Sequence, residues 1–500
     1  MFEKILIANR GEIARRIMRT CRKMGIRTVA VYSEADRDMP YVKEADEAHY
    51  IGESAPVYSY LNIARIIEVA RAVGADAIHP GYGFLAENHL FARACAEAHI
   101  VFIGPNPEVI EAMGNKLKAL KIAKKAGVPT LNRSRGAIER KDDESAEDYD
   151  ERAIKTAKNI GYPLLVKPQG GGGGIGMKVV YSEKELLPAL ETCRSQARGA
   201  FGNASIYLEQ YLEDVSHIEV QILGDSRGRA VHLFERDCSI QRRNQKIVEE
   251  SPARKLDGKQ RQLVCKYAIK IVKRVNKELK TSYTGAGTVE FLVDQNGDVY
   301  FIEMNTRLQV EHGVTEMVTG KDLVELQILI AGGRELPFRQ TDIKRSGHAI
   351  EVRIYPEIWD AWREEFILQS GPLAAVTLPG DTDGDIRIDS ALDAGESYSI
   401  PIDYEPLIMK VVCSGGNREN ARLRLLRVLR EGIVLSGVYT NVVFLERIIA
   451  SQGFCDNKHN TRFLKSKEMA SELAIESERI RMEKLTRNLW THSGSLTSTL

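Results

Sequence analysis

The chain has 500 residues, with 43% apolar and 28% charged side chains and a formal net charge of +1. This length predicts roughly three domains, each able to bury its own core, and the composition is ordinary for a globular protein. Because the net charge is close to zero, bulk electrostatic attraction to nucleic acid or to anionic membranes is excluded, although a local basic pocket is compatible with it.

Targeting and membrane signals are missing from the pattern. The seven cysteines show no CxxC or zinc spacing, which favours reduced thiols. The first residues, MFEKILIANRGEI, predict a strand entering a loop rather than a signal or transit peptide. No apolar run approaches the ~18–20 residues that a membrane span needs. We therefore expect a soluble protein of the cytoplasm.

The first 112 residues alternate short apolar runs with amphipathic helical patterns. The apolar runs lie at 4–8, 28–32, 77–84 and 101–105, and the helical patterns at 12–24, 62–73 and 91–98. This strand–helix–strand rhythm predicts a parallel α/β domain. No GxGxxG motif follows the first strand, so the sequence does not support a dinucleotide site.

A run of five glycines, Gly170–Gly174, marks the next region. It lies between a strand pattern at 162–169, which contains Lys167, and a second strand pattern at 175–180. Glycines lack Cβ, so their backbone N–H groups can approach anionic oxygens closely and the loop can open and close. We interpret this run as a mobile phosphate-binding lid. The alternative is a flexible linker.

The segments around this lid are more varied. A helix is predicted at 116–126 and a charged surface excursion or loop at 139–152. Strand patterns follow at 204–211, 217–223 and 231–234, and a long amphipathic helix at 260–279. The densely polar run at 235–245 is compatible with a solvated loop or with a surface that faces an anion.

The segment Gly287–Glu311 carries the strongest chemical signal. Two β-rich runs flank Asn296-Gly297, which predicts a hairpin with these two residues as its turn. That turn places Glu290 directly opposite Glu303. One face is then apolar, with Val289, Phe291 and Val293 against Met304, Ile302 and Tyr300.

The other face of this hairpin carries Glu290, Glu303 and Asn305. Directly opposed side chains lie roughly 4.5–5.5 Å apart, so two like charges there repel each other unless they are neutralised. Two carboxylates and an amide oxygen are hard ligands suited to Mg²⁺. The hairpin therefore predicts a magnesium site, and the alternative is an exposed strand face with scattered acids.

The last third of the chain is a mixed pattern. A strand is predicted at 348–354, turns at Gly371-Pro372, Pro379-Gly380 and Pro401, and helices at 417–431 and 441–450. Met409-Lys410 lies in the apolar run YEPLIMKVV, which indicates a core strand. The charged helical pattern at 465–485 fades into a Ser/Thr-rich end and indicates a surface or subunit-contact helix.

Together these features resemble the ATP-grasp fold, and residues 1 to about 464 are similar to the biotin carboxylase family. The matching segments are KILIANRGEIA, HPGYGFLAEN, FIGP, MGNK, KPQGGGGGIGM, ERDCSIQRRNQKIVEESPA, GAGTVEFL and FIEMNTRLQVEH. The resemblance implies an α/β and α+β multidomain fold. Its parts are an N-terminal parallel α/β domain at 1–112, an ATP-grasp domain at 113–335 with a lid at about 130–206, a C-terminal mixed β/α domain at 336–464 and a helical tail at 465–500.

The activity implied by the resemblance is that of a biotin carboxylase subunit, an ATP-dependent C–N ligase. With ATP and Mg²⁺ (or Mn²⁺), bicarbonate would carboxylate biotin through carboxyphosphate, as the first half-reaction of an acyl-CoA or pyruvate carboxylase. No Met-Lys-Met biotin attachment motif occurs. We therefore expect the biotin carboxyl carrier protein and the carboxyltransferase to be separate chains, and the subunit to be a homodimer. The sequence does not identify the acyl acceptor.

The resemblance also assigns roles by position. ATP-binding positions are Lys116, Lys167, Gly173, Gly174, the adenine hinge Glu209, Gln210, Tyr211 and Leu212, and His217 and Asn244. Magnesium ligands are Glu290, Glu303 and Asn305. The bicarbonate site comprises Lys246, Arg307, Gln309, Val310 and Glu311, with Glu311 as general base, and Arg353 stabilises the biotin enolate.

Several positions depart from the family pattern. These are Ile175 for a basic residue in the lid, Gln210 for lysine, Asn244 for histidine, Gly313 for proline, Glu405 for aspartate, and the stretch 354–359. The departures at Ile175, Gln210 and Asn244 leave a degenerate regulatory subunit open as an alternative. Another ATP-grasp ligase, such as a carbamoyl-phosphate synthetase-like half, is a second alternative.

Overall fold

The structure is a computed structural model, and it describes residues 1–140, 143–168, 176–201, 205–242, 244–360, 365–379, 384–475 and 477–479. Of the glycine lid, residues 170–174 lie outside this part of the chain. No helix in the described ranges is both long enough and apolar enough to cross a membrane.

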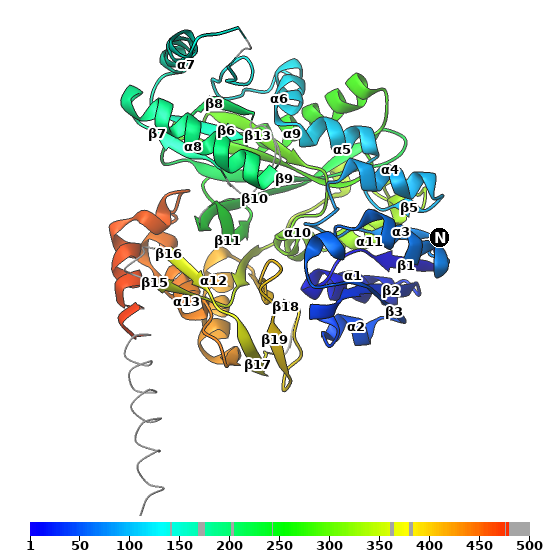
Figure 1. Ribbon diagram of the computed structural model, residues 1–500. Helices are drawn as coiled ribbons and strands as arrows, with labels where there is room; N and C mark the ends of the chain where they lie inside the picture. Colours follow the sequence, from blue (N-terminus) through cyan, green and yellow to red (C-terminus); the bar gives the residue numbers. More distant parts are fainter. Residues whose placement is uncertain are drawn as a thin grey trace, which may run out of the picture.

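The N-terminal region is a five-stranded parallel sheet in the order β3-β2-β1-β4-β5 (Figure 1). Its elements are β1 Lys4–Ile7, α1 Gly11–Lys23, β2 Arg27–Ser33, η1 Glu34–Asp36, α2 Pro40–Glu44, β3 Glu47–Gly52, η2 Pro56–Tyr58, α3 Ile63–Ala72, β4 Ala77–His79, α4 His89–Glu97 and β5 Val101–Phe102. The predicted parallel α/β architecture is confirmed. The edge strand β3 escaped prediction because its exposed and half-buried residues form no apolar run.

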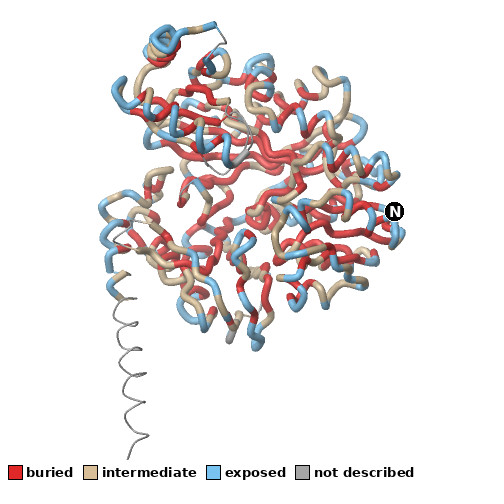
Figure 2. The backbone as a smooth tube through the Cα atoms, in the orientation of Figure 1, coloured by how far each residue is buried: buried red, intermediate tan, exposed pale blue. Residues whose placement is uncertain are grey.

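One eight-stranded sheet forms the centre of the molecule, in the order β13-β12-β9-β10-β11-β14-β20-β18. Its strands are β9 Ser216–Gly224, β10 Ala230–Arg242, β11 Gln245–Ser251, β12 Gly285–Val293, β13 Val299–Asn305, β14 His348–Ile354, β18 Ile386–Ser390 and β20 Met409–Gly415. Buried residues follow these strands (Figure 2). Because β11 pairs with β14, the sheet continues from the central region into the C-terminal region without a break.

Helices cover the central sheet and connect it to the N-terminal region. They are α5 Pro107–Gly114, α6 Lys116–Lys125, α9 Gly258–Leu279, α10 His312–Thr319 and α11 Leu323–Ala331, with the short η3 Gln340–Asp342. The 22-residue α9 starts at a capping box, in which Asp257 and Gln260 bond each other's backbone N–H groups. Its apolar residues pack against β9 and β12 in one core with α5 and α6.

The lid region is a separate small layer, at the top of Figure 1. A three-stranded sheet, β7-β6-β8, combines β6 Leu164–Pro168, β7 Lys178–Val180 and β8 Ile206–Gln210 with α7 Ala146–Ile160 and α8 Glu183–Phe201. The surface loop expected at 139–152 is therefore wrong in its second half. Helix α7 begins there because Ser145 caps it, accepting the Asp148 N–H, and because Ala153 and Ala157 give it a buried stripe.

The polar run at 235–245 is not a solvated loop. Residues 235–242 lie in β10, and Gln245 begins β11. Residues 235–240 are buried, so their charges are paired inside the protein rather than hydrated.

The C-terminal region combines small sheets with helices. They are β15 Glu357–Asp360, β16 Glu365–Leu368, β17 Gly371–Thr377, β19 Ser397–Ile400, β21 Val434–Ser436, α12 Arg418–Arg427, the π-helical turn Val428–Gly432, α13 Val442–Ala450, α14 Gln452–Cys455, η5 Phe463–Lys465 and a helix at 467–475. The turn expected at Gly371-Pro372 is wrong, because these residues begin β17. The core strand predicted around Met409-Lys410 is confirmed as β20.

The β12–β13 hairpin keeps its predicted register at residues 288–290 of β12 and departs from it at residues 291–293, nearer the turn. Glu290 lies opposite Glu303, as predicted, but Phe291 lies opposite Phe301, with a register shift between the two pairs. A bulge at Ile302 accounts for this shift. The turn is also longer, because Asp294 Oδ1 accepts the N–H groups of Asn296 and Asp298 at 2.9 Å each.

The bulge corrects the predicted apolar face. Val299, Phe301 and Met304 are buried there, whereas Tyr300 and Ile302 are only half-buried. The longer turn and the bulge each shift the pairing by one residue, and the two shifts cancel at the carboxylates. The opposed acids therefore survive although the predicted turn is wrong.

This register predicts unequal costs for two neighbouring substitutions. Phe301→Ala removes a side chain that is 1% exposed and should lower the free energy of unfolding by about 3–5 kcal/mol. Tyr300→Ala should cost about 1 kcal/mol or less. Denaturant titration of both variants measures the difference. A larger loss of unfolding free energy for Tyr300→Ala than for Phe301→Ala would contradict the bulged register and support the register without a bulge.

Candidate active site

The opposed carboxylates form the centre of a polar cluster on the face of the sheet away from the apolar core. Glu290 Oε1 accepts hydrogen bonds from Lys246 Nζ at 2.9 Å, from Asn305 Nδ2 at 2.8 Å and from Gln309 Nε2 at 2.9 Å. One carboxylate oxygen thus joins three side chains that the sequence pointed to separately. Glu303 lies directly across the strand pair.

The two carboxylates have different electrostatic surroundings. Burial opposes ionisation of Glu290, but Lys246 and His217 outweigh it and hold its pKa well below the usual value. Burial raises the pKa of Glu303, and the Glu290 charge raises it further. Within the described residues, no hydrogen bond or ion pair engages the Glu303 carboxylate. A divalent cation would relieve this repulsion, so the donor set fits Mg²⁺.

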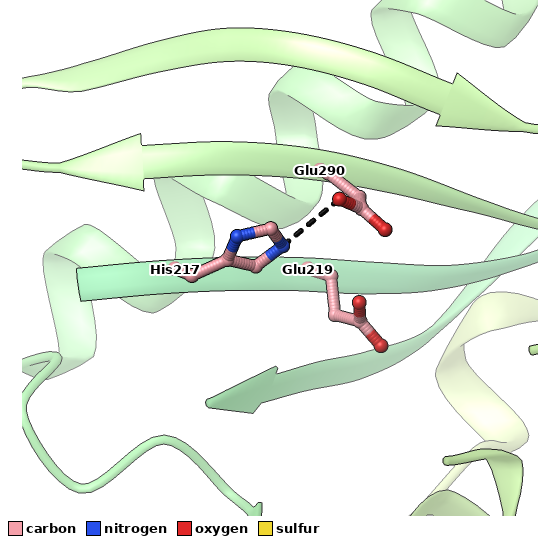
Figure 3. A group of neighbouring side chains, drawn as sticks. All are labelled: His217, Glu219 and Glu290. Atoms are coloured by element: carbon pink, nitrogen blue, oxygen red, sulfur yellow. Dashed lines mark ion pairs between the residues drawn. The ribbon is translucent and has the colours of Figure 1, made fainter. Parts of the chain in front are cut away.

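His217 and Glu219 extend the cluster along β9 (Figure 3). His217 Nε2 lies 2.9 Å from Glu290 Oε2, and ligand atoms of His217, Glu219 and Glu290 all lie within 4.8 Å of one another. Glu219 was not predicted as a site residue. The signal was available, because residues two apart on a strand share a face and His217 was already a candidate.

Lys246 connects the carboxylates of three different segments. Its Nζ bonds Glu219, Glu290 at 2.9 Å and Glu311 at 2.8 Å. Burial alone would lower the pKa of Lys246, but the three carboxylates raise it well above the usual value. Lys246 is therefore a permanent cation in the middle of the site.

Arg236 holds Glu219 in place from inside the sheet. Its guanidinium is fully buried and forms an ion pair with Glu219. It also donates to Gln221 at 2.8 Å and to Thr315 at 2.9 Å. Arg236 lies in the polar run at 235–245 and was not predicted, because the sequence alone does not distinguish a buried guanidinium from a solvated one.

Glu311 lies between two cations. Lys246 contacts one carboxylate oxygen, and Arg353 Nη2 contacts the other at 2.9 Å. Burial opposes its ionisation, but these cations hold the pKa of Glu311 well below its usual value. Arg353 comes from β14 and also pairs with Glu249 of β11 at 2.6 Å. The continuous sheet thus brings the C-terminal region to the carboxylate cluster.

Arg307 connects the cluster to the N-terminal region. Its Nε donates to Glu87 Oε2 at 2.9 Å, and its Nη1 donates to Gln309 Oε1 at 3.2 Å. The backbone oxygen of Val310 accepts from the buried Lys410 Nζ at 2.9 Å. Glu87 was not predicted as a site residue, although it lies within HPGYGFLAEN.

The two lysines predicted to bind phosphate interact electrostatically with Glu303. Lys167 Nζ donates to Glu209 Oε1 at 2.7 Å. Burial lowers the pKa of Lys116, while Glu303 acts in the opposite direction. Lys116, Lys167 and Glu303 therefore share one electrostatic neighbourhood. The predicted lid residues Gly173, Gly174 and Ile175 lie outside the described residues.

The remaining positions predicted to bind the nucleotide have the following surroundings. In the predicted hinge, the N–H of Gln210 donates to Asn132 O at 2.7 Å, the N–H of Tyr211 donates to Pro163 O at 3.0 Å, and Leu212 is half-buried. Asn244 is exposed in the β10–β11 turn with φ +64°.

The departures in the C-terminal region contact one another or their neighbours. Tyr355 Oη donates to Glu405 Oε1 at 3.2 Å, and Arg242 Nη1 pairs with Glu357 Oε2 at 2.9 Å. At Gly313, a Cβ would lie 2.7 Å from Glu351 Oε2. The smaller residue thus leaves room for this buried carboxyl group.

Sequence models of three protein families match consecutive parts of the chain. "Biotin carboxylase, N-terminal domain" matches residues 1–110, "Carbamoyl-phosphate synthase L chain, ATP binding domain" matches 115–339, and "Biotin carboxylase C-terminal domain" matches 351–466. The proposed domain limits at 112, 335 and 464 lie near these ranges and stay predictions.

Similar proteins cover nearly the whole chain. Biotin carboxylase 2 of Bacillus subtilis is 48% identical over 93% of this chain and 99% of its own length. A pyruvate carboxylase subunit of Methanothermobacter thermautotrophicus is 46% identical over 93% of this chain and 90% of its own.

Solved structures agree with these relatives. A biotin carboxylase complex with "beta-gamma-ATP" from Campylobacter jejuni has a TM-score of 0.85 at 43% identity, and the match covers 93% of this chain and 99% of that one. The Hydrogenobacter thermophilus 2-oxoglutarate carboxylase biotin carboxylase domain, a dimer with MgADP, ADP and bicarbonate, has a TM-score of 0.85 at 44% identity. It covers 93% of this chain and 97% of that one.

Two adjacent glutamates of β11 predict opposite pH effects on stability. Burial raises the pKa of Glu249 to about 7, although Arg353 opposes it. The folded state then holds the Glu249 proton more tightly than the unfolded chain, so this contribution is lost as pH rises through 7. We expect the Tm of Glu249→Gln to rise relative to the wild type between pH 5 and 8.

Glu250→Gln provides the matched comparison. Burial opposes ionisation of Glu250, but His348, His459 and Arg418 hold its pKa well below the usual value. Its contribution is present at neutral pH and lost as pH falls. The Tm of Glu250→Gln should therefore lie below the wild type at pH 7 and approach it in acid. The same trend in both variants would contradict the opposite pKa shifts.

Proposed function

The chain belongs to the biotin carboxylase family and carboxylates biotin with bicarbonate at the expense of ATP; on this basis we propose how its residues divide the work. The observation that carries the proposal is the Lys246 ammonium, which connects Glu219, Glu290 and Glu311. Lys246 thus connects Glu290 of the β12–β13 hairpin to Glu311, the proposed base, within one buried site.

In the first step, Glu311 is the general base. Its carboxylate is ionised and held between Lys246 and Arg353, so it can accept the proton of the bicarbonate hydroxyl. Arg307 and Lys246 hold the bicarbonate anion, with Gln309 and the Val310 backbone completing the cradle. An oxygen of bicarbonate attacks the γ-phosphorus, ADP leaves, and carboxyphosphate forms.

The nucleotide side uses the lysines next to the lid. Lys116 and Lys167 bind phosphate oxygens, and residues 209–212 receive the adenine. Lys167 is also paired with Glu209, so phosphate oxygens would compete with this carboxylate for the Lys167 ammonium. His217 and Asn244 are proposed to contact the nucleotide.

Magnesium is proposed to bind Glu290, Glu303 and Asn305. The support is the opposed pair itself, in which the Glu303 carboxylate is repelled by Glu290 and engages no partner among the described residues. When bound, the ion neutralises phosphate charge as it develops.

In the second step, carboxyphosphate releases CO₂ and phosphate. The phosphate takes the proton from the biotin ureido nitrogen, and the nitrogen then bonds to CO₂. Arg353 and Arg307 stabilise the enolate form of biotin through charge and hydrogen bonding. Arg353 is suited to this role because Glu249 and Glu311 hold its guanidinium in one orientation.

We also propose that this protein works with a separate biotin carboxyl carrier protein and a separate carboxyltransferase, as a homodimer in the cytoplasm. The Methanothermobacter relative, which is named as one subunit of pyruvate carboxylase, supports the separate chains. The dimer of the 2-oxoglutarate carboxylase domain supports the homodimer. Lys410 is buried in β20, so it is unavailable for biotin attachment.

Removing the base or the anion-binding guanidinium should abolish the bicarbonate response. Glu311→Ala and Arg307→Ala should each lower bicarbonate-dependent ATP hydrolysis by about 10²–10⁴-fold and remove its stimulation by free biotin. Lys277→Gln, on the exposed face of α9, is the control and should match the wild type. ATP hydrolysis that responds to an amine and not to biotin would contradict the proposal.

The magnesium assignment predicts a change in metal requirement. Glu303→Gln keeps the shape of the side chain but removes its charge, so the Mg²⁺ concentration for half-maximal activity should rise roughly 10–100-fold. Glu325→Gln, on an exposed position of α11, should leave it unchanged. An unchanged requirement in Glu303→Gln would place the ion elsewhere.

A further inference from the structure

A groove of about 730 Å³ lies between α9 and β10. None of the residues assigned above to the active site lines this groove. Its floor comprises Ala230, His232, Phe234, Cys265 and Ile269. Cys265 is 3% exposed. Burial lowers the pKa of His232 to about 4, so this imidazole is neutral at pH 7 and the floor carries no charge there. The volume is typical of sites for small ligands.

The rim of the groove is cationic. Lys266, Lys270 and Lys273 follow one another at helical spacing along α9, and Arg261 lies near the start of the helix. No aspartate or glutamate lines the groove. Arg261 is already paired with Glu235, whereas no ion pair engages the three lysines in the described part of the chain. The groove therefore combines an apolar floor with unneutralised positive charge.

Phe234 occupies an unusual position in this floor. Its φ of +64° lies in the left-handed region, which is strained for a bulky side chain. The pairing of β10 with β9 shifts register between His232 and Glu235, and such a bulge changes the direction of the side chains it contains. Strained residues of this kind cluster at ligand sites. Here the result is an aromatic wall of the groove, with Arg345 over the ring at 5.4 Å.

The strand edge beside the groove has no partner strand among the described residues. β11 pairs with β10 only from Asp237 onward, so no strand in the described ranges pairs with residues 230–236 on that side. Instead, the Gln340 side chain bonds both the N–H and the C=O of His232, at 2.9 and 3.0 Å. The backbone N–H and C=O of His232 are therefore hydrogen-bonded, and the groove offers a ligand apolar surface and positive charge.

We propose that this groove binds an aliphatic carboxylate, with its chain against Phe234 and Ile269 and its carboxylate among the lysines of α9. The argument is charge complementarity over an apolar floor: a neutral apolar molecule would leave the lysines without partners, and a small anion would leave the floor without cover. The proposal does not depend on the catalytic assignments above.

Titration calorimetry of the full chain with dodecanoate, below its micelle concentration, tests the site. We expect one saturable site per chain, weaker binding of octanoate and no measurable binding of acetate. Lys266→Gln/Lys270→Gln/Lys273→Gln should raise the Kd for dodecanoate about tenfold, since each exposed charge contributes a fraction of that factor. Lys277→Gln, outside the groove on the same helix, should bind as the wild type does.

Phe234→Gly tests the floor separately. Glycine accepts a φ of +64° without strain, so this variant should fold while losing the aromatic wall, and its Kd should rise by at least a similar factor. Circular dichroism checks the fold, and bicarbonate-dependent ATP hydrolysis should persist in every groove variant. The absence of saturable binding, equal Kd values for the lysine triple variant and Lys277→Gln, or an unchanged Kd in Phe234→Gly would each overturn the proposal.

Discussion

The site depends on one buried ammonium that neutralises several acids at once. Glu219, Glu290 and Glu311 come from different segments, and each is nearly excluded from solvent. Such a group of carboxylates would be too costly to bury without a cation at hydrogen-bonding distance from all of them. Lys246 provides that cation from the neighbouring β11, so the position of this strand fixes the rest of the site.

The sequence alone identified the parts of the site that repeat with a simple period. The parallel N-terminal region, helix α9 and the opposition of Glu290 to Glu303 all follow from spacing. The bulge at Ile302 could not be foreseen from the sequence. Apolar residues face the core whether the strands pair with or without the bulge, and the two registers differ only in which apolar residues these are. A longer turn compensates for the bulge, so the chemistry was predicted from an incorrect register.

The residues that escaped prediction act from behind the site. Arg236 and Glu249 are buried ionisable side chains that orient Glu219 and Arg353. The sequence alone does not distinguish a buried charged residue from an exposed one, because burial depends on whether the fold provides a partner of opposite charge. Those partners lie on other strands, so they become visible only after the strand order is known.

The pairing of β11 with β14 has a consequence for how the chain can be divided. A cut near residue 336 would separate two strands that are joined at Val248–Val352, Glu249–Glu351, Glu250–Ile350 and Ser251–Ala349. Each fragment would expose an unpaired seven-residue strand edge, and such edges tend to self-associate. The matches to the two family models are separated near this boundary, but the boundary does not divide the protein into independent sheets. The central and C-terminal regions therefore stabilise each other through this strand pairing.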